Sequence, residues 1–152
     1  MDATAKELNL KRSIRKFFID ALGSTENVYF DYLYDTPVDE SGNKVTSWMV
    51  ILLETRNLNT LSNQSLDIHL FTTKDREGDR MSALIDTVYG ILEDENMPDN
   101  NKRIPLYDTE SSPWTLIGGI VPVKIIDGEN SPAKDKTKYK LLKVDLRWSA
   151  KV

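Results

Sequence analysis

An uninterrupted run of six apolar residues at positions 48–53 (WMVILL) constrains this chain more than any other stretch of its sequence. A strand that is apolar on both sides needs a cover on both of its faces, so it belongs inside a sheet. We therefore expect a strand over residues 45–55 at the centre of the fold, with other strands beside it and helices packed against it.

Two segments have the spacing of amphipathic helices, 3–22 and 79–95. Gly23 is expected to end the first, and Asp79 to cap the N–H groups that open the second. Gly90 lies inside the second helix, which suggests close packing against a neighbour. The expected buried stripes are Leu10, Ile14, Phe17, Phe18, Ala21 and Leu22 in the first helix, and Met81, Leu84, Ile85, Val88, Ile91 and Leu92 in the second.

The remaining apolar segments have the character of strands. Residues 27–35 form an aromatic strand, expected to pair antiparallel with 45–55 as a hairpin whose long connection is 36–44. Residues 65–73 alternate, with Leu66, Ile68 and Leu70 inside and Asp67 and His69 outside. Further strands are expected at 103–107, 114–126 and 138–151, the last with a slip in its alternation near 142–143.

Two stretches interrupt the second half of the chain. The pair Gly118-Gly119, and then Pro122, lie within the strand 114–126 and predict bulges or a bend there. Residues 127–137 contain Gly128, Pro132 and several charges, and are expected to form a loop.

Together these elements predict an α+β fold. The 152 residues are expected to form a single domain, 1–152, in which two α-helices pack on one face of a mostly antiparallel mixed β-sheet. The passage from strand 65–73 through a helix to another strand could add one parallel pairing.

Composition excludes several classes of protein. The absence of cysteine rules out a disulfide scaffold, thiol catalysis and Cys-based zinc sites. No apolar run approaches the roughly 18 residues of a membrane-spanning helix, and the first residues lack the pattern of a secretory signal, so no membrane partner is expected.

Charge is segregated along the chain, whose net charge is −4. Residues 1–16 carry five basic and two acidic side chains (+3), and 132–151 carry seven basic and two acidic (+5). Residues 17–131 hold eight basic and twenty acidic side chains (−12). Basic ends on an acidic body suit docking onto an acidic surface, including another copy of the chain, although lysines also occur on simply solvated faces.

A search for catalytic chemistry finds weak signals only. The single histidine, His69, has Asp67 two residues before it but no third metal ligand, so a surface or interface histidine is the better interpretation. The chain has neither a serine elbow nor a phosphate-binding glycine loop, and no cofactor is expected.

The strongest enzymatic alternative is a magnesium-dependent nuclease. Asp31 or Asp35 precedes Glu54, which heads a Glu-Thr-Arg sequence where such nucleases have Glu-x-Lys. Arg56 replaces the lysine that would activate water, which weakens the match. Sequence-specific DNA recognition is not expected, because the isoelectric point is about 5.1.

The order and character of the elements resemble a family of virion proteins. A leading helix runs into the aromatic strand 27–32 (NVYFDY), a long apolar strand follows at 47–55, and an alternating strand feeds the amphipathic helix at 80–86 (RMSALID). The closing strand is 140–148 (KLLKVDLRW). This pattern resembles the tail terminator, or tail completion, proteins of phages with long non-contractile tails, across nearly the whole chain.

The resemblance implies a structural role and no enzymatic activity. Such proteins form a hexameric ring on the last ring of tail tube subunits, stop polymerisation, and offer a surface to which the filled head attaches. The implied partners are other copies of the chain, the tail tube protein and a head-completion or connector protein. DNA would pass through the lumen without sequence recognition. The implied location is the head-proximal end of the virion tail, assembled in the host cytoplasm.

Candidate assembly contacts come from charge and from loops. They are the helical residues Lys11, Arg12 and Arg15, and Lys134 and Lys136 in 127–137. Loops 36–44 and 96–102 are also expected to extend toward a neighbouring subunit. The alternative from a different class is a small acidic binding or inhibitor module that masks a basic partner, which would fit the size and isoelectric point equally well.

Overall fold

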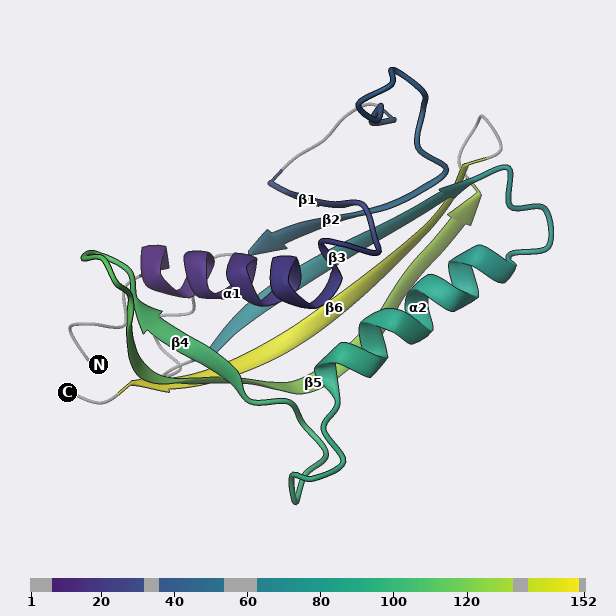
Figure 1. The fold of residues 1–152 in the computed structure, drawn as a ribbon. Helices are drawn as coiled ribbons and strands as arrows, with labels where there is room; N and C mark the ends of the chain where they lie inside the picture. Colours follow the sequence, from purple (N-terminus) through teal and green to yellow (C-terminus); the bar gives the residue numbers. More distant parts are fainter. Residues whose placement is uncertain (1–6, 32–35, 54–62, 133–136, 151–152) are drawn as a thin grey trace.

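Six strands form one sheet in the order β1-β2-β3-β6-β5-β4, and two helices pack against it (Figure 1). The computed structural model describes residues 7–31, 36–53, 63–132 and 137–150. Every pairing in the sheet is antiparallel except β1 with β2, so the α+β class with a mostly antiparallel sheet is confirmed. The elements are α1 (Glu7–Leu22), β1 (Val28–Phe30), β2 (Ser47–Leu53), β3 (Asn63–Thr73), α2 (Asp79–Leu92), β4 (Ile104–Asp108), β5 (Thr115–Pro132) and β6 (Thr137–Ala150).

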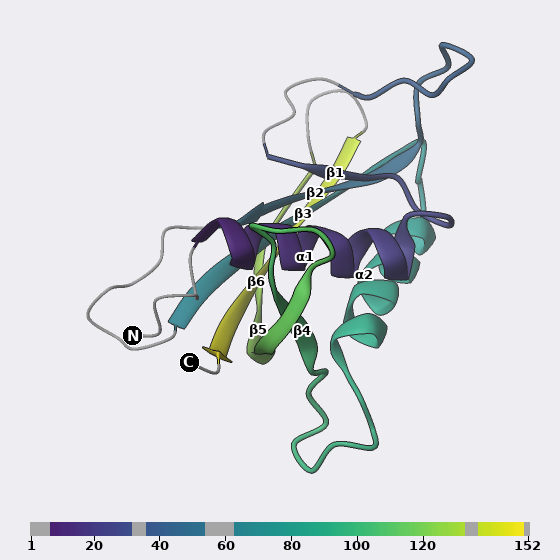
Figure 2. The ribbon, with the colours of Figure 1, turned by 60° about the vertical axis from the view of Figure 1, so that its left-hand side comes forward.

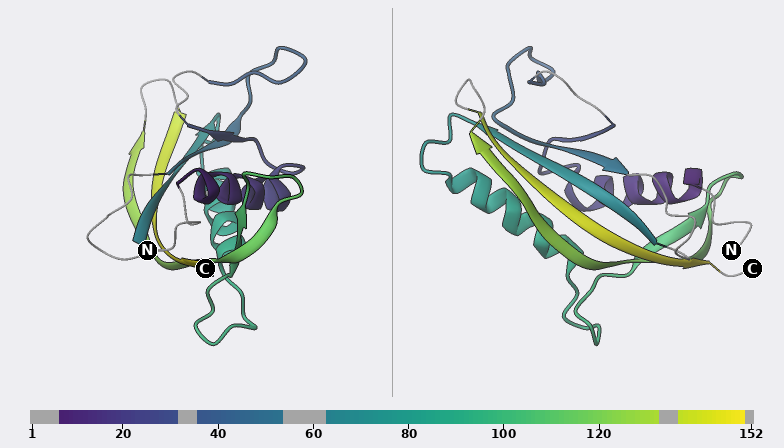
Figure 3. Two further views of the ribbon diagram at one scale, coloured as in Figure 1. Left: turned by 90° about the vertical axis from the view of Figure 1, so that its left-hand side faces the viewer. Right: turned by 180° about the vertical axis from the view of Figure 1, so that it is seen from behind.

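The sheet curls into a half-barrel that wraps around the helices (Figure 3, left). Both helices turn their apolar stripes into its concave side and share one core with the sheet, as their 3.6-residue period requires. The core includes Leu10, Ile14, Phe18 and Leu22 of α1, Met81, Leu84, Val88 and Leu92 of α2, and Leu66, Ile68, Leu70, Leu142, Val144, Leu146 and Trp148 of β3 and β6.

A smaller apolar cluster covers part of the convex side. Trp48 and Val50 of β2 are buried there together with Val45, and Trp48 stacks on Phe71 with ring centroids 5.0 Å apart. Met49 and Ile51 face the main core on the other side of the strand. The expectation that the apolar run is covered on both faces is therefore confirmed.

The first two strands do not form the predicted antiparallel hairpin. β1 runs parallel to β2, with Val28 beside Met49 and Phe30 beside Ile51, which places both β1 side chains against the main core. A parallel pair needs a crossover of about a dozen residues, and the long stretch between the two strands supplies that length. β1 is also shorter than the expected 27–35, of which 32–35 lie outside the described residues.

Most of the predicted loop at 127–137 belongs to strands, since β5 extends to Pro132 and β6 begins at Thr137. The predicted slip near 142–143 is also wrong, because β6 pairs with β3 without any shift of register. The irregularities are all on the β5 side, and two of them lie where the glycine pair and Pro122 predicted them.

The start of α2 also differs from expectation. Asp79 makes no capping hydrogen bond. The buried carboxylate of Asp75 accepts hydrogen bonds from the backbone N–H groups of Arg80 (3.2 Å) and Met81 (2.9 Å), and from the hydroxyl of Thr72 (3.0 Å). Gly90 is exposed, and a Cβ there would meet nothing within 4 Å, so the predicted close packing is wrong.

Candidate functional site

The basic residues predicted on α1 lie together, and two of them hold the end of β1. Lys11 Nζ lies 3.0 Å from Asp31 Oδ1, and Arg15 Nη2 lies 2.9 Å from Asp31 Oδ2. The Arg15 guanidinium also lies over the Phe30 ring, 5.8 Å from its centroid. Asp31 has a φ of 67°, a left-handed conformation that aspartate adopts more readily than most residues.

The hydrogen bond from Lys11 is the main reason that the pKa of the Asp31 carboxyl lies below its ordinary value, and the charge of Arg15 adds to the effect. A carboxyl group with a lowered pKa stabilises the fold above its unfolded pKa and loses that contribution as pH falls through the folded value. The contribution is small, because about half of the side chain is exposed.

Replacing Asp31 by alanine is expected to lower the free energy of unfolding by about 1–2 kcal/mol, most of it from the left-handed backbone. Asp31→Gly also removes both ion pairs but fits this backbone, so it should cost about 1 kcal/mol or less. Urea unfolding at pH 7 measures both changes. Equal losses in the two variants would assign the effect to the ion pairs instead.

The third predicted residue, Arg12, belongs to a polar network between α1 and β4. Its Nη1 donates to the carbonyl oxygen of Thr109 (3.1 Å) and lies 3.3 Å from that residue's Oγ1. Thr109 N–H and Oγ1–H donate in turn to Asn9 Oδ1, at 3.0 and 2.8 Å. Tyr107 N–H donates to Ser13 Oγ at 2.9 Å. Asn9, Ser13 and Thr109 are all buried.

This network closes one edge of the sheet. β4 is the last strand in the sheet order, so the outward N–H groups of its segment have no neighbouring strand. Side-chain oxygens of α1 satisfy those of Tyr107 and Thr109. Pro105, two residues before Tyr107 on the same edge, has no N–H to satisfy. The edge is therefore covered by a helix in place of a seventh strand.

A groove of about 540 Å³ runs along the exposed side of this junction. Its lining combines four charged side chains of α1 with one aliphatic side chain and two aromatic rings. The lining residues are Arg12, Arg15, Lys16, Ile19, Asp20, Tyr107 and Trp114. A second hollow of about 320 Å³ shares Lys16, Asp20 and Tyr107 with the groove, and continues it past Pro105 and Lys102.

Large apolar side chains are exposed around the groove. Trp114 is 39% exposed, Ile19 is 52% exposed, and Leu116 nearby in sequence is 63% exposed. The Trp114 and Tyr107 rings lie 6.1 Å apart. Exposed apolar side chains that gather within a charged rim are typical of protein-binding surfaces. We refer to the 540 Å³ groove lined by these residues as the α1–β4 groove.

The structure thus brings Lys11, Arg12 and Arg15 together, although each also has an intramolecular partner. Lys134 and Lys136 lie outside the described residues. Sequence reasoning missed Ile19, Tyr107 and Trp114. Trp114 stands alone in the polar stretch 108–115, and such an isolated aromatic residue was a signal of exposure that could have been used.

Only some of the residues behind the nuclease and metal-site hypotheses lie in the described part of the structure. Three residues of the nuclease hypothesis lie outside the described residues: Asp35, Glu54 and Arg56. The fourth, Asp31, forms ion pairs with Lys11 and Arg15. His69 Nδ1 lies 2.7 Å from the hydroxyl of Tyr139. Within residues 7–31, 36–53, 63–132 and 137–150, no three acidic or histidine side chains gather as a metal site would require. No helix in these ranges has the length and apolar character needed to cross a membrane.

Comparison with known proteins gives a fold but no family. No described protein family and no curated protein matches the sequence. Eight chains of solved structures match. In one of them, the superposition has a TM-score of 0.53 at 10% sequence identity and covers 91% of this chain and 95% of that chain. At this identity the likeness shows a shared fold over nearly the full length of both chains.

Proposed function

We propose that this protein is a structural assembly subunit that closes the tail tube of a long-tailed, non-contractile phage. In this role, copies of the chain form a hexameric ring on the tube end, stop its polymerisation and present the surface to which the head attaches. The element order of the sequence resembles that of tail terminators. The observation that carries the proposal is the α1–β4 groove with its exposed Trp114 and Ile19, since exposed aromatic and aliphatic side chains gathered among charges are suited to a protein partner.

The charge distribution supports a contact between copies. A ring requires a heterologous interface, in which one patch meets a different patch on the next copy. The helix α1 carries four basic and two acidic side chains, a net charge of +2. Residues 79–99 carry six acidic side chains and one basic, a net charge of −5. Opposite charges on separate surfaces favour head-to-tail over like-to-like contacts.

The proposal names three kinds of partner: other copies of this chain, the tail tube protein, and a head-completion or connector protein. DNA crosses the ring without being recognised, because an acidic chain repels phosphate. The protein acts at the head-proximal end of the tail and assembles in the host cytoplasm. In this role it has no substrate and no turnover.

Native mass spectrometry against protein concentration tests the ring. We expect a closed species of about 104 kDa, six times the 17.4 kDa of one chain, and six-fold rings in negative-stain electron microscopy. A strict dimer at every concentration would contradict the ring and favour a masking module. Cleavage of DNA with magnesium that is lost in Glu54→Ala would contradict the structural role altogether.

A further inference from the structure

The loop between α2 and β4, residues 93–103, projects from the body of the molecule (Figures 1 and 2). It is held by its own hydrogen bonds. Asp94 N–H donates to the carbonyl oxygen of Asn100 (2.9 Å), and Lys102 N–H donates to that of Leu92 (3.0 Å). Glu93 and Asn101 form an antiparallel bridge at its base. A preformed projection loses little conformational freedom when it binds.

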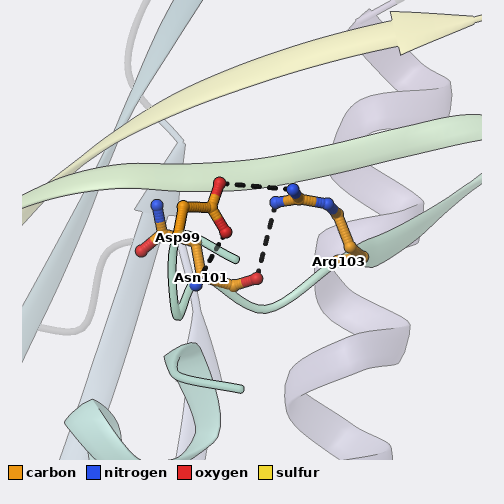
Figure 4. A network of polar contacts seen from close by, with 3 residues as sticks. All are labelled: Asp99, Asn101 and Arg103. Carbon is orange, nitrogen blue, oxygen red and sulfur yellow. Dashed lines mark hydrogen bonds and ion pairs between the residues drawn. The ribbon is translucent and has the colours of Figure 1, made fainter. Parts of the chain in front are cut away.

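Asp99 stiffens the same loop through two side-chain contacts (Figure 4). Its Oδ1 accepts a hydrogen bond from Asn101 N–H (3.1 Å), and its Oδ2 pairs with Arg103 Nη2 (3.2 Å). Arg103 Nη1 lies 3.4 Å from the carbonyl oxygen of Asn101. The pKa of Asp99 is lowered, first by the Asn101 N–H bond and then by Arg103, so this carboxylate stays charged in its contacts.

The loop is acidic, with an apolar tip between its charges. Glu93 and Glu95 are exposed, and Met97-Pro98 lie between them and Asp99. Residues 93–101 contain four acidic side chains and no basic one, and Lys102 and Arg103 at the end of the loop bring the net charge of 93–103 to −2. An anionic projection with an apolar centre suits a groove lined by basic and apolar side chains.

The α1–β4 groove has such a lining. Arg12 and Arg15 use only some of their five N–H donors in the contacts described above. Lys16 pairs with Asp20 at 2.7 Å in an exposed i,i+4 ion pair, which is weak and exchanges readily for another carboxylate. The groove also contains Trp114 and Tyr107, the kind of aromatic anchors that carry binding energy at protein interfaces.

We propose that the acidic loop 93–101 of one copy seats in the α1–β4 groove of the next copy. This inference rests on the proposed ring, for which it names the two surfaces that meet. The loop and the groove are different patches of one chain, as a heterologous contact requires. A chain's own loop points away from α1 (Figures 1 and 2), so the occupant of the groove comes from a neighbour.

Nucleic acid is the less suitable occupant. Asp20 lies in the groove among the basic residues, and the chain as a whole carries a net charge of −4. A phosphate backbone would meet repulsion from both. The loop meets the same Asp20, but its charges are confined to a few side chains around the apolar Met97-Pro98, which the apolar side chains of the groove can receive.

Two charge reversals test the contact, Lys16→Glu in the groove and Glu95→Lys in the loop. Each is expected to weaken self-association about tenfold, as read by native mass spectrometry against concentration. Lys124→Glu and Glu40→Lys are the matched controls, because they make the same charge changes at exposed positions that belong neither to the groove lining nor to the loop. Thermal unfolding followed by circular dichroism establishes that all four variants are folded.

Mixing the two reversed variants is the sharper test. In each variant alone, loop and groove carry like charges at the altered positions and repel. Between the two variants both contacts are attractive. The altered, acidic groove of one variant meets the altered, basic loop of the other, and the unaltered Glu95 of the first meets the unaltered Lys16 of the second. An equimolar mixture is therefore expected to regain assembly with equal numbers of the two variants, which the native mass spectrum shows when one variant is uniformly labelled with 15N.

Tryptophan fluorescence gives a second readout. Of the three tryptophans, Trp48 and Trp148 are buried, whereas Trp114 is exposed in the groove. We expect acrylamide quenching to fall as the wild type assembles, and to stay high in Lys16→Glu. Quenching that falls equally in Trp114→Phe would place the covered surface elsewhere and overturn the inference.

The outcomes separate the inference from the proposed ring. A six-copy ring that forms equally well in Lys16→Glu, Glu95→Lys and both controls overturns the loop-in-groove contact and leaves the ring intact. A wild type that stays monomeric at about 1 mM overturns the contact between free copies. If the wild type binds a short DNA strand in a polarisation assay, and Lys16→Glu loses this binding while Glu95→Lys keeps it, nucleic acid is the occupant instead.

Discussion

Replacing Asp75 by alanine should lower the free energy of unfolding by about 3 kcal/mol, measured by urea unfolding at pH 7. The side chain is only 7% exposed and accepts three hydrogen bonds, two of them from backbone N–H groups in the first turn of α2. Without the carboxylate, the N–H groups of Arg80 and Met81 have no acceptor, because no carbonyl group within the helix can reach the N–H groups of its first turn. Asp79→Ala is the matched control, and it should cost less than about 0.5 kcal/mol, because Asp79 makes no capping hydrogen bond.

The Asp75 carboxylate should also make the stability difference between the wild type and a variant that lacks it depend on pH. Burial acts to raise the pKa of Asp75, but the hydrogen bonds from Met81, Arg80 and Thr72 outweigh it and hold the pKa below its ordinary value. Its contribution is therefore complete above the unfolded pKa of about 4 and is lost as pH falls through the folded value. The gap between wild type and Asp75→Asn should narrow in acid, and a gap that widens below about pH 4 would contradict this assignment.

The second large effect is expected at Asn9. Asn9→Ala removes the acceptor of Thr109 N–H and Oγ1–H, and leaves both donors buried at the covered edge of the sheet. Leaving such groups without a partner costs about 1–3 kcal/mol, so we expect a loss of about 2–3 kcal/mol in urea unfolding. The exposed β4 edge should also make the variant aggregate more readily on heating.

Leu8→Ala is the control for Asn9→Ala, since it truncates the adjacent residue on the same helix. Leu8 is exposed, so its removal should change stability by less than about 0.5 kcal/mol. Ser13→Ala tests the same edge at Tyr107 N–H and is expected to cost about 1–2 kcal/mol. Equal stabilities of all three variants would show that α1 does not satisfy this edge.

Local patterns predicted the elements well, because each depends on residues close in sequence. The alternation of Leu66, Ile68 and Leu70 corresponds to buried positions. Of the predicted stripe of α2, four residues are buried, and Ile85 and Ile91 are partly buried against the core. Pairing direction depends on which distant segments meet, and the spacing of β1 and β2 is equally compatible with a hairpin and a crossover. The loop predicted at 127–137 failed for a similar reason, since pairing with β6 extends β5 to Pro132 despite its glycine and charges.

The sequence predicted some residues of the site but not how they come together. Lys11, Arg12 and Arg15 stood out by charge, yet their partners Asp31 and Thr109 are 16 to 97 residues away in sequence. The groove depends on β4 meeting α1, a contact between segments about 100 residues apart that no local pattern contains. The burial of Asp67 was not predictable either. Its place between Leu66 and Ile68 puts it on the outer face of the sheet, as expected, but the side chain is buried there.

The position of β6 has a consequence for how the chain is made. β6 follows all other strands in sequence and yet lies between β3 and β5, so it joins a half-sheet of β1, β2 and β3 to one of β5 and β4. Until the ribosome releases β6, both half-sheets keep an open edge. The nascent chain is thus expected to keep two unpaired sheet edges until β6 emerges, after which the sheet closes in one cooperative step.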